Sequence, residues 1–245
     1  MPSPSTVAEV VARMQSAVST LPRGDGVACF TRLYLAVTTG VQERLAGLVF
    51  ADPRFLAQLD IVFANLFFSA LETATTNPTR MPRAWAPLVE ARSARGVAPL
   101  QFALAGMSAH INRDLPVALV ATCQELGIAL EEGSPQHADY VHVNRVLAEV
   151  EAEVKAQYLT GWLNRVDRLL HRIHRIDDVV AMWNVARARD AAWVSGEALW
   201  ALRNEPALSA RYLVTLDRTV GLTARGLLVP ADTWLQQLAR ALRRA

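Results

Sequence analysis

The sequence predicts an all-α fold, a single-domain irregular helical bundle of about eight to ten helices with a broken central helix. Apolar residues recur at spacings of three and four in long runs, and no stretch alternates as a half-buried strand would. Turn-forming residues separate the runs. With 245 residues, 52% of them hydrophobic, the chain is long enough for one well-buried core. We therefore expect residues 1–245 to form one domain.

In the first part of the chain, apolar periodicity predicts helices over residues 6–21, 27–50 and 55–75. The turn signals Pro22 to Gly26 and Asp52-Pro53 separate them. Between residues 76 and 99 the chain carries Pro78, Pro82, Pro87 and Pro99, which only short helical pieces tolerate. This segment is predicted to be a proline-rich connector or flap, with one short helix near residues 85–95.

Residues 104–120 are apolar along nearly their whole length, as a central buried helix would be. Pro116 has no backbone N–H and disfavours a helical residue before it, so a kink or break is expected there. Residues 127–135 are predicted to be a loop. Further helices are expected after it, over residues 140–158, 160–176, 177–203, 207–223 and 232–244.

Charge and hydropathy exclude some classes of function. The net charge is +2 and no long block of like charge occurs, so we expect no nucleic-acid partner. The first residues lack the charged start and apolar run of a signal peptide. The most lipid-like stretch, residues 55–71, contains Gln58, Asp60 and Asn65, so we expect no membrane span. A cytoplasmic protein is predicted.

Three polar residues lie inside the apolar stretch 104–120: His110, Asn112 and Asp114. Each costs roughly 1–3 kcal/mol when buried without a partner. On a continuous helix His110 and Asp114 share one face with Gly106, which leaves space beside the imidazole, and Asn112 lies opposite. On a broken helix Asp114 caps the second half, Asn112 bonds the free backbone, and His110 bonds a carbonyl. The second arrangement has a purely structural interpretation, but interrupted helices inside a core are also favoured places for sites, and only a break would let Asn112 act together with His110 and Asp114.

Other polar residues fall on or near apolar helix faces. Asn144 lies at the margin of the stripe in the predicted helix 140–158, and Asp139 is placed to cap that helix. Asp60 and Glu72 are further possible inward acids.

The predicted helix 177–203 has an inner side that includes Trp183, Asp190, Trp193 and Glu197, with Arg187 at its edge. A buried ion pair between Arg187 and Asp190 is the structural alternative. By contrast, a helical-wheel projection of the predicted helix 160–176 places His171 and His174 on its outward face.

Several short motifs together resemble one bacterial family. They are Tyr34 with Thr38, Phe50-Ala51-Asp52-Pro53, Leu59-Asp60 with Phe63-Ala64, Trp85, Gly106-Met107-x-Ala109-His110-Ile111-Asn112-x-Asp114-Leu115-Pro116, Asp139-Tyr140-x-x-Val143-Asn144, and Ala186-Arg187-x-x-x-Ala191-x-Trp193. The chain is similar to a domain-of-unknown-function family whose hallmark is the His-Ile-Asn-x-Asp-Leu-Pro core. It departs at Tyr140, where relatives often carry a His. The resemblance brings no established activity and implies that the following residues belong together: His110, Asn112, Asp114, Asp139, Asn144 and Arg187.

The leading functional hypothesis is an enzyme that uses acid/base chemistry, of the cyclase, isomerase or lyase type, without a cofactor. Its substrate is expected to be a small, largely apolar molecule in a pocket between helices. His110 transfers the proton, Asp114 orients it, and Arg187 stabilises charge. The residues expected to bind the substrate are Asn112, Asn144, Trp183 and Trp193, with aromatic walls such as Phe67.

Two alternatives stay open at the level of the sequence. The first is a metal-dependent hydrolase of an ester or phosphoester, with a divalent metal held by His110, Asp114 and one or more of Asp139, Asp190 and Glu197. The second is a non-catalytic module that binds an apolar ligand or a partner helix. The sequence leaves the oligomeric state open.

Overall fold

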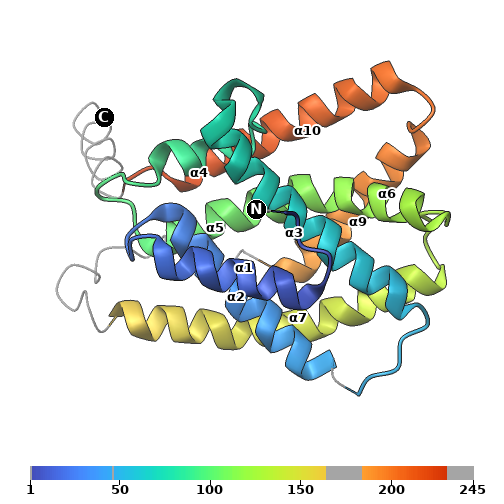
Figure 1. Cartoon of the computed structure of the whole chain (residues 1–245), viewed down its shortest axis with the longest axis horizontal. Helices are drawn as coiled ribbons and strands as arrows, with labels where there is room; N and C mark the ends of the chain where they lie inside the picture. The colour runs from blue at the N-terminus through green and yellow to red at the C-terminus, as the bar shows by residue number, and fades with distance from the viewer. Residues whose placement is uncertain (1, 46, 164–183, 231–245) are drawn as a thin grey trace, which may run out of the picture.

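The computed structural model describes residues 2–45, 47–163 and 184–230 (Figure 1). These residues form an all-α helical bundle with no strand, as the sequence predicts. Most of the predicted helix 160–176 and all of 232–244 lie outside the described residues, as do His171, His174 and Trp183.

The first three helices lie where the apolar periodicity predicts them: α1 (Val7–Thr20), α2 (Gly26–Leu45) and α3 (Pro53–Thr76). Thr6 and Glu9 form a reciprocal capping box at the start of α1. Asp52 caps α3 by accepting a hydrogen bond from the Phe55 N–H at 3.0 Å. Helix α2 ends before the predicted residue 50, and two residues beyond it Gly47 has a φ of +86°, which is incompatible with a continuing helix.

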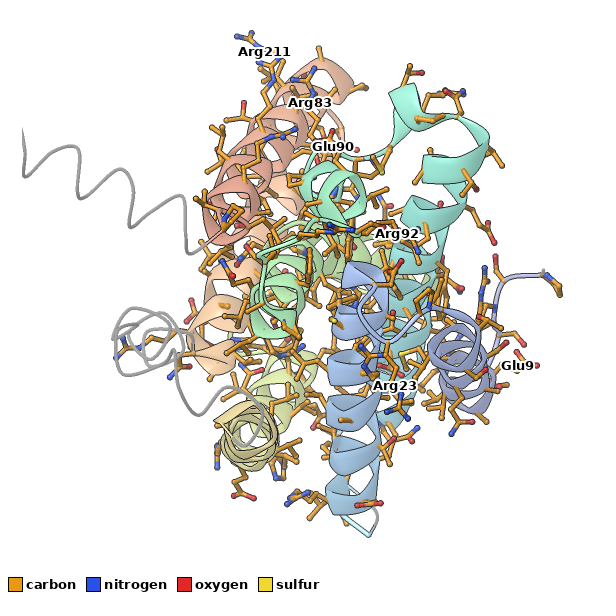
Figure 2. All side chains as sticks on the ribbon, turned by 90° about the vertical axis from the view of Figure 1, so that its left-hand side faces the viewer. Glu9, Arg23, Arg83, Glu90, Arg92 and Arg211 are labelled. Atoms are coloured by element: carbon orange, nitrogen blue, oxygen red, sulfur yellow. The ribbon has the colours of Figure 1, made fainter. Side chains whose placement is uncertain are left out.

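The proline-rich connector forms only two short helical pieces, η1 (Pro78–Arg80) and α4 (Ala86–Ala91). Its second half forms ion pairs with residues at the start of α2 and in α10 (Pro206–Leu227). The Arg92 side chain pairs with Asp25 at 2.7 Å, and Glu90 pairs with Arg225 at 3.0 Å. Figure 2 shows Arg83 and Glu90 beside α10 and Arg92 near the start of α2. Two ion pairs near the end of α4 thus attach the connector to residues outside it.

The central helix is continuous, so the predicted break is wrong. Helix α5 (Pro99–Ala109) passes into one π-helical turn (His110–Asp114) and then into α6 (Leu115–Leu126). The Leu115 N–H donates to the carbonyl of His110, five residues earlier. A π-turn inserts one extra residue into the helix. The chain therefore passes the missing N–H of Pro116 by widening one turn instead of breaking.

The remaining described helices are α7 (Pro135–Leu163), α9 (Val185–Ala201) and α10 (Pro206–Leu227). Helix α7 begins before the predicted residue 140 and runs on through the boundary expected at residues 158–160. The helices pack around α5 and α6: α2 and α10 contact α5, while α3 and α9 contact α6 (Figure 1). The π-turn therefore lies inside the bundle.

Gly106 allows α5 and α2 to approach closely. A Cβ atom at this position would lie 2.4 Å from Cγ of Phe30. The ring of Phe30 in turn contacts those of Phe67 and Trp85, with centroids 5.0 and 5.3 Å away. An aromatic cluster thus fills the space beside the π-turn, including the gap that the sequence predicted next to His110.

Helix α3 is the one described helix that is long and apolar enough to cross a membrane by length and composition, with a mean hydropathy of 1.4 in its most apolar window. Core helices of soluble proteins meet the same criterion. One side of α3 is buried against the bundle, through Phe55, Leu59, Phe63 and Phe67.

Candidate functional site

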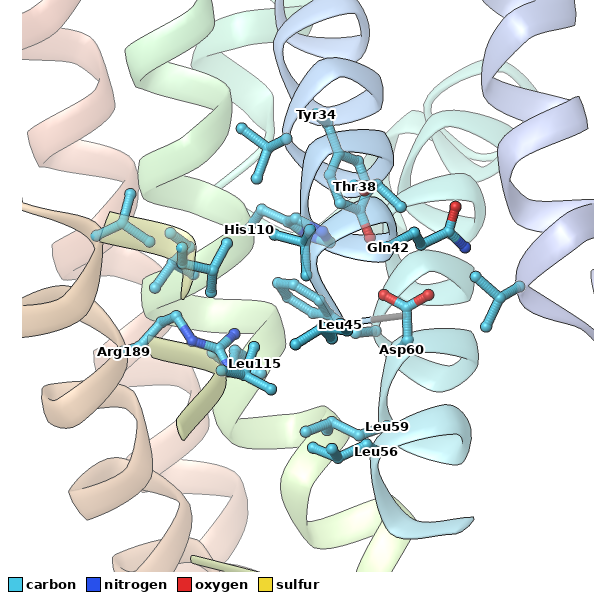
Figure 3. A pocket seen from close by; sticks show the side chains of 18 of the residues that line it. Tyr34, Thr38, Gln42, Leu45, Leu56, Leu59, Asp60, His110, Leu115 and Arg189 are labelled. Atoms are coloured by element: carbon cyan, nitrogen blue, oxygen red, sulfur yellow. The ribbon is translucent and has the colours of Figure 1, made fainter. Parts of the chain in front are cut away.

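A cavity of about 480 Å³ lies between α2, α3, the π-turn, α7 and α9 (Figure 3). Its wall is mainly aliphatic, and the side chains with polar groups in it are Tyr34, Thr38, Gln42, Asp60, His110 and Arg189. Gln42 and Ala57 are exposed. The cavity therefore opens between the end of α2 and the start of α3. An apolar pocket with a few convergent polar groups is the common form of a small-molecule site.

His110 and Asp114 face each other across the π-turn. The Nδ1 atom of His110 lies 3.3 Å from Oδ2 of Asp114, and the two residues are 1% and 0% exposed. The carboxylate is itself held in place, because it accepts hydrogen bonds from Trp85 Nε1 at 2.9 Å and from Arg113 at 2.7 Å. This arrangement favours the tautomer with the proton on Nδ1. The lone pair is then on Nε2.

The imidazole of His110 is enclosed by aromatic rings. Phe63 stacks on it at 3.5 Å with an interplanar angle of 5°, and the Tyr34 ring lies edge-on at 4.5 Å. Burial lowers the pKa of His110, while Asp114 acts in the opposite direction. The ring is therefore neutral near pH 7. Its Nε2 is buried and has no hydrogen-bond partner among the described residues.

Two further titratable groups reach the cavity. The Tyr34 hydroxyl is buried and, in the described part of the chain, also lacks a hydrogen-bond partner. Burial raises its pKa well above the ordinary value. Burial also raises the pKa of Asp60 to about 6, although Arg189 acts to lower it. Perturbed groups gathered in one pocket are typical of functional sites.

Arg189 is the cation of the cavity, and α7 holds it in position. Its Nε donates to the Asn144 side-chain oxygen at 2.5 Å, and its guanidinium lies 4.3 Å from the ring centroid of Tyr140. Asn144 in turn donates to Asp190 at 3.0 Å. No hydrogen bond or ion pair to a described residue uses the two terminal nitrogens of Arg189. Arg189 and Asp60 enter the cavity from opposite sides (Figure 3).

The structure brings together only part of the predicted site. His110 and Asp114 are in contact, and Asn144 reaches the cavity indirectly, through Arg189. Asn112 points away and donates to the Ser108 hydroxyl at 3.3 Å. The structural alternative for this stretch is wrong as well, because Asp114 makes no cap hydrogen bond.

Helix α9 presents a different face from the predicted one. Arg187 and Asp190 are exposed, and they do not form the buried ion pair that was the structural alternative. Trp193 is buried, but it packs on Tyr140 and lies outside the cavity wall. The observed inner side contains Val185, Arg189, Ala192, Trp193, Gly196 and Leu199. Phe67 is likewise a core residue that does not line the cavity.

Of the five predicted metal ligands, His110 and Asp114 are in contact, and the other three bind elsewhere. Asp139 does not cap a helix; its carboxylate accepts the backbone N–H groups of Ala51 and Asp52 at 3.0 and 2.6 Å. Asp190 accepts from Asn144, and Glu197 accepts from Trp193 Nε1 at 3.0 Å. Within the described ranges no group of three or more His, Cys, Asp or Glu side chains is placed to hold a metal ion.

Three cavity residues were absent from the predicted site. Asp60 was predicted only as a possible inward acid, from its place in an apolar stretch, and Tyr34 only as part of a family motif. Arg189 gave no signal that distinguished it from Arg187. Glu72, the other possible inward acid, is exposed and pairs with Arg13 at 2.5 Å.

Comparisons with characterised proteins and with solved structures give no match. A sequence model of one protein family matches residues 7–230, a range that includes every residue of the cavity. The resemblance inferred from the His110 motif is thereby confirmed at the level of a family without known activity. The chain belongs to the family of unknown function DUF5995.

Proposed function

We propose that this protein is an enzyme that moves protons on a small, largely apolar molecule held in the cavity. One observation carries the proposal: His110 is fixed through Nδ1 by a buried carboxylate while its Nε2 has no partner in the described structure. A neutral imidazole held in this way is suited to act as a general base. The aliphatic wall supports an apolar substrate.

The groups around His110 supply complementary roles. When the imidazole takes a proton from the substrate, the positive charge is stabilised by Asp114, which is a positioning residue. Asp60 acts as a second acid or base, because its pKa of about 6 lies close to neutrality. Arg189 stabilises negative charge that develops on a substrate oxygen. An isomerisation, cyclisation or elimination needs such a pair of proton carriers with an electrostatic stabiliser.

One feature favours a second function, binding without catalysis. Phe63 covers one face of the His110 ring at 3.5 Å, and Nε2 is buried. Catalysis requires the Phe63 side chain to shift when the substrate enters, whereas an apolar ligand could bind in the cavity without reaching Nε2. The two functions therefore differ in whether His110 exchanges a proton with the ligand.

Hydrogen exchange in D₂O distinguishes them. The protein is incubated with a panel of apolar ketones, enones and oxo acids of six to twelve carbons, and deuterium uptake at carbon is followed by mass spectrometry. We expect uptake with at least one compound. His110→Gln should lower the rate by about 10²–10⁴-fold, the usual contribution of a general base. Asn112→Ala, two residues away and outside the cavity, is the matched control and should retain the rate.

Circular dichroism and thermal unfolding establish that both variants are folded. Equal exchange by folded His110→Gln and by the wild type would contradict the proposed role of His110. Panel compounds that bind but never exchange would assign the protein to the binding function instead.

A further inference from the structure

The wall of the cavity carries a buried cation that is only partly satisfied. Arg189 is 8% exposed, and only its Nε makes a hydrogen bond, to Asn144 at 2.5 Å. The ring of Tyr140 covers one face of the guanidinium. The two terminal nitrogens have no hydrogen-bond partner among the described residues, and Asp60 lies beyond ion-pair distance. These nitrogens are not enclosed by protein atoms, so they face the open space of the cavity, where an anion from outside can reach them.

We propose that the ligand of this cavity is an apolar monocarboxylate whose carboxylate binds the terminal nitrogens of Arg189. This inference rests on the proposed function and names its substrate class. A guanidinium presents parallel N–H groups that match the two oxygens of a carboxylate. Because Asn144 and Tyr140 hold the guanidinium in place, little conformational entropy is lost when the carboxylate binds.

The rest of the wall agrees with a single anionic group on an apolar body. Tyr34 adds a buried hydroxyl without a partner among the described residues, which can donate to the ligand once the side chains that cover it shift. The aliphatic residues, such as Val37, Leu45, Leu59 and Leu147, surround the remaining space. The volume of about 480 Å³ is ample for a chain of roughly ten carbons. A cationic ligand would be repelled by Arg189, and only ionised Asp60 would oppose this repulsion.

Asp60 makes the proposal sensitive to pH. The other titratable or charged groups that line the cavity with it are Tyr34 from α2, His110 from the π-turn and Arg189 from α9. A carboxylate bound to Arg189 is repelled by ionised Asp60 but not by protonated Asp60. The carboxylate should therefore bind more tightly near pH 6, where Asp60 is about half protonated, than at pH 8.

Isothermal titration calorimetry with three ten-carbon probes tests the class of ligand. The probes are decanoate, decanol and decyltrimethylammonium, each used as monomer at pH 6 and at pH 8. We expect decanoate to bind most tightly at both values. Its affinity should be about fivefold to tenfold higher at pH 6, while decanol should show no such dependence.

Two variants change the affinity for decanoate in opposite directions. Arg189→Met should weaken binding at least tenfold, and Arg187→Met, an exposed neighbour on α9, is the matched control that should leave it unchanged. Asp60→Asn should strengthen binding at pH 8 about tenfold and remove the pH dependence. If Arg189→Met does not fold, the gain of affinity in Asp60→Asn still tests the proposal.

The outcomes separate this inference from the proposed function. Tighter binding of decanol or decyltrimethylammonium than of decanoate overturns the monocarboxylate inference and leaves an enzyme for another apolar substrate intact. Weaker decanoate binding in Asp60→Asn at pH 8 also overturns the inference. Failure of all three probes to bind would contradict both proposals.

Discussion

Asp60 shows how a single residue relates the cavity to stability. Its pKa of about 6 in the folded protein exceeds the ordinary value of 3.8, mainly because burial disfavours the charged form. Between these values the folded state holds the proton more strongly than the unfolded state. Stability therefore falls as pH rises from about 4 to about 6, and the penalty persists at higher pH. A residue that destabilises the fold at neutral pH is typical of a functional site.

Asp60→Asn should therefore stabilise the protein at pH 8. The full pKa shift corresponds to about 3 kcal/mol, and partial exposure reduces the expected gain to about 1–2 kcal/mol. At pH 4 the difference from wild type should shrink, because Asp60 is then protonated in the folded state. Urea unfolding at both pH values measures this. Glu43→Gln, an exposed acid on α2, is the control, and destabilisation by Asp60→Asn at pH 8 would refute this account.

The sequence identified cavity residues only where a polar residue lies within an apolar stretch. His110 and Asp114 stand out because apolar neighbours surround them, and their contact is confirmed at 3.3 Å. Arg189 has alanines nearby on both sides, and Arg187 occurs in the same short stretch, two residues earlier. Since alanine marks neither the core nor the surface, the helical phase of that segment was not determined by its composition. The inward arginine could be identified only from its tertiary partner Asn144.

At the level of a whole element, the central helix was also predicted only in part. Pro116 correctly indicates a disturbed backbone, but local rules did not distinguish a break from one widened turn. Packing decides between them, because a break would leave backbone groups unpaired inside the core. Gly106 was also identified correctly as a position that leaves space. The structure fills that space with Phe30, whose ring centroid lies 5.7 Å from that of His110.

Gly106→Ala should destabilise the protein by about 1–3 kcal/mol. The new Cβ would lie 2.4 Å from the Phe30 ring, which cannot shift freely because Phe67 and Trp85 pack against it. The gain in helix propensity, up to about 1 kcal/mol, offsets only part of this. Thermal and urea unfolding measure the change.

Gly226→Ala provides the control for helix propensity, because a Cβ atom added at this position in α10 would have no atom within 4 Å. This variant should be neutral or slightly more stable than wild type. An equal response of the two glycine variants would show that the close approach of α2 and α5 does not depend on Gly106.

For the molecule as a whole, the sequence predicted the helices better than the contacts between them. Periodicity located α1 to α3 and α10 to within a few residues, since each has a clear apolar stripe or a proline at its start. It misplaced a boundary at residues 158–160, where α7 continues to Leu163, the last described residue of this segment. The long-range polar contacts had no local signal. Asp139 holding the Ala51 amide is one such contact.

Asp217 of α10 makes the contact with the largest sequence separation among those described, 134 residues, to Arg83. Through Arg113 it also lies close to the buried carboxylate of Asp114. The Asp217 carboxylate accepts the backbone N–H groups of Arg83 and Ala84 at 2.7 and 3.0 Å. It also lies 3.6 Å from Nε of Arg113, which donates to Asp114 at 2.7 Å. Helix α10 and the connector therefore both support the carboxylate that orients His110.

A double-mutant cycle between Asp217→Asn and Asp114→Asn measures this support. Each single variant should destabilise the protein, and because both carboxylates share Arg113 their effects should differ from additivity by about 1 kcal/mol. Asp139→Asn combined with Asp114→Asn is the control pair, since these two residues share no partner. The control pair should be additive within about 0.5 kcal/mol. Additive effects in the Asp217 pair would mean that α10 fixes the connector without influencing Asp114.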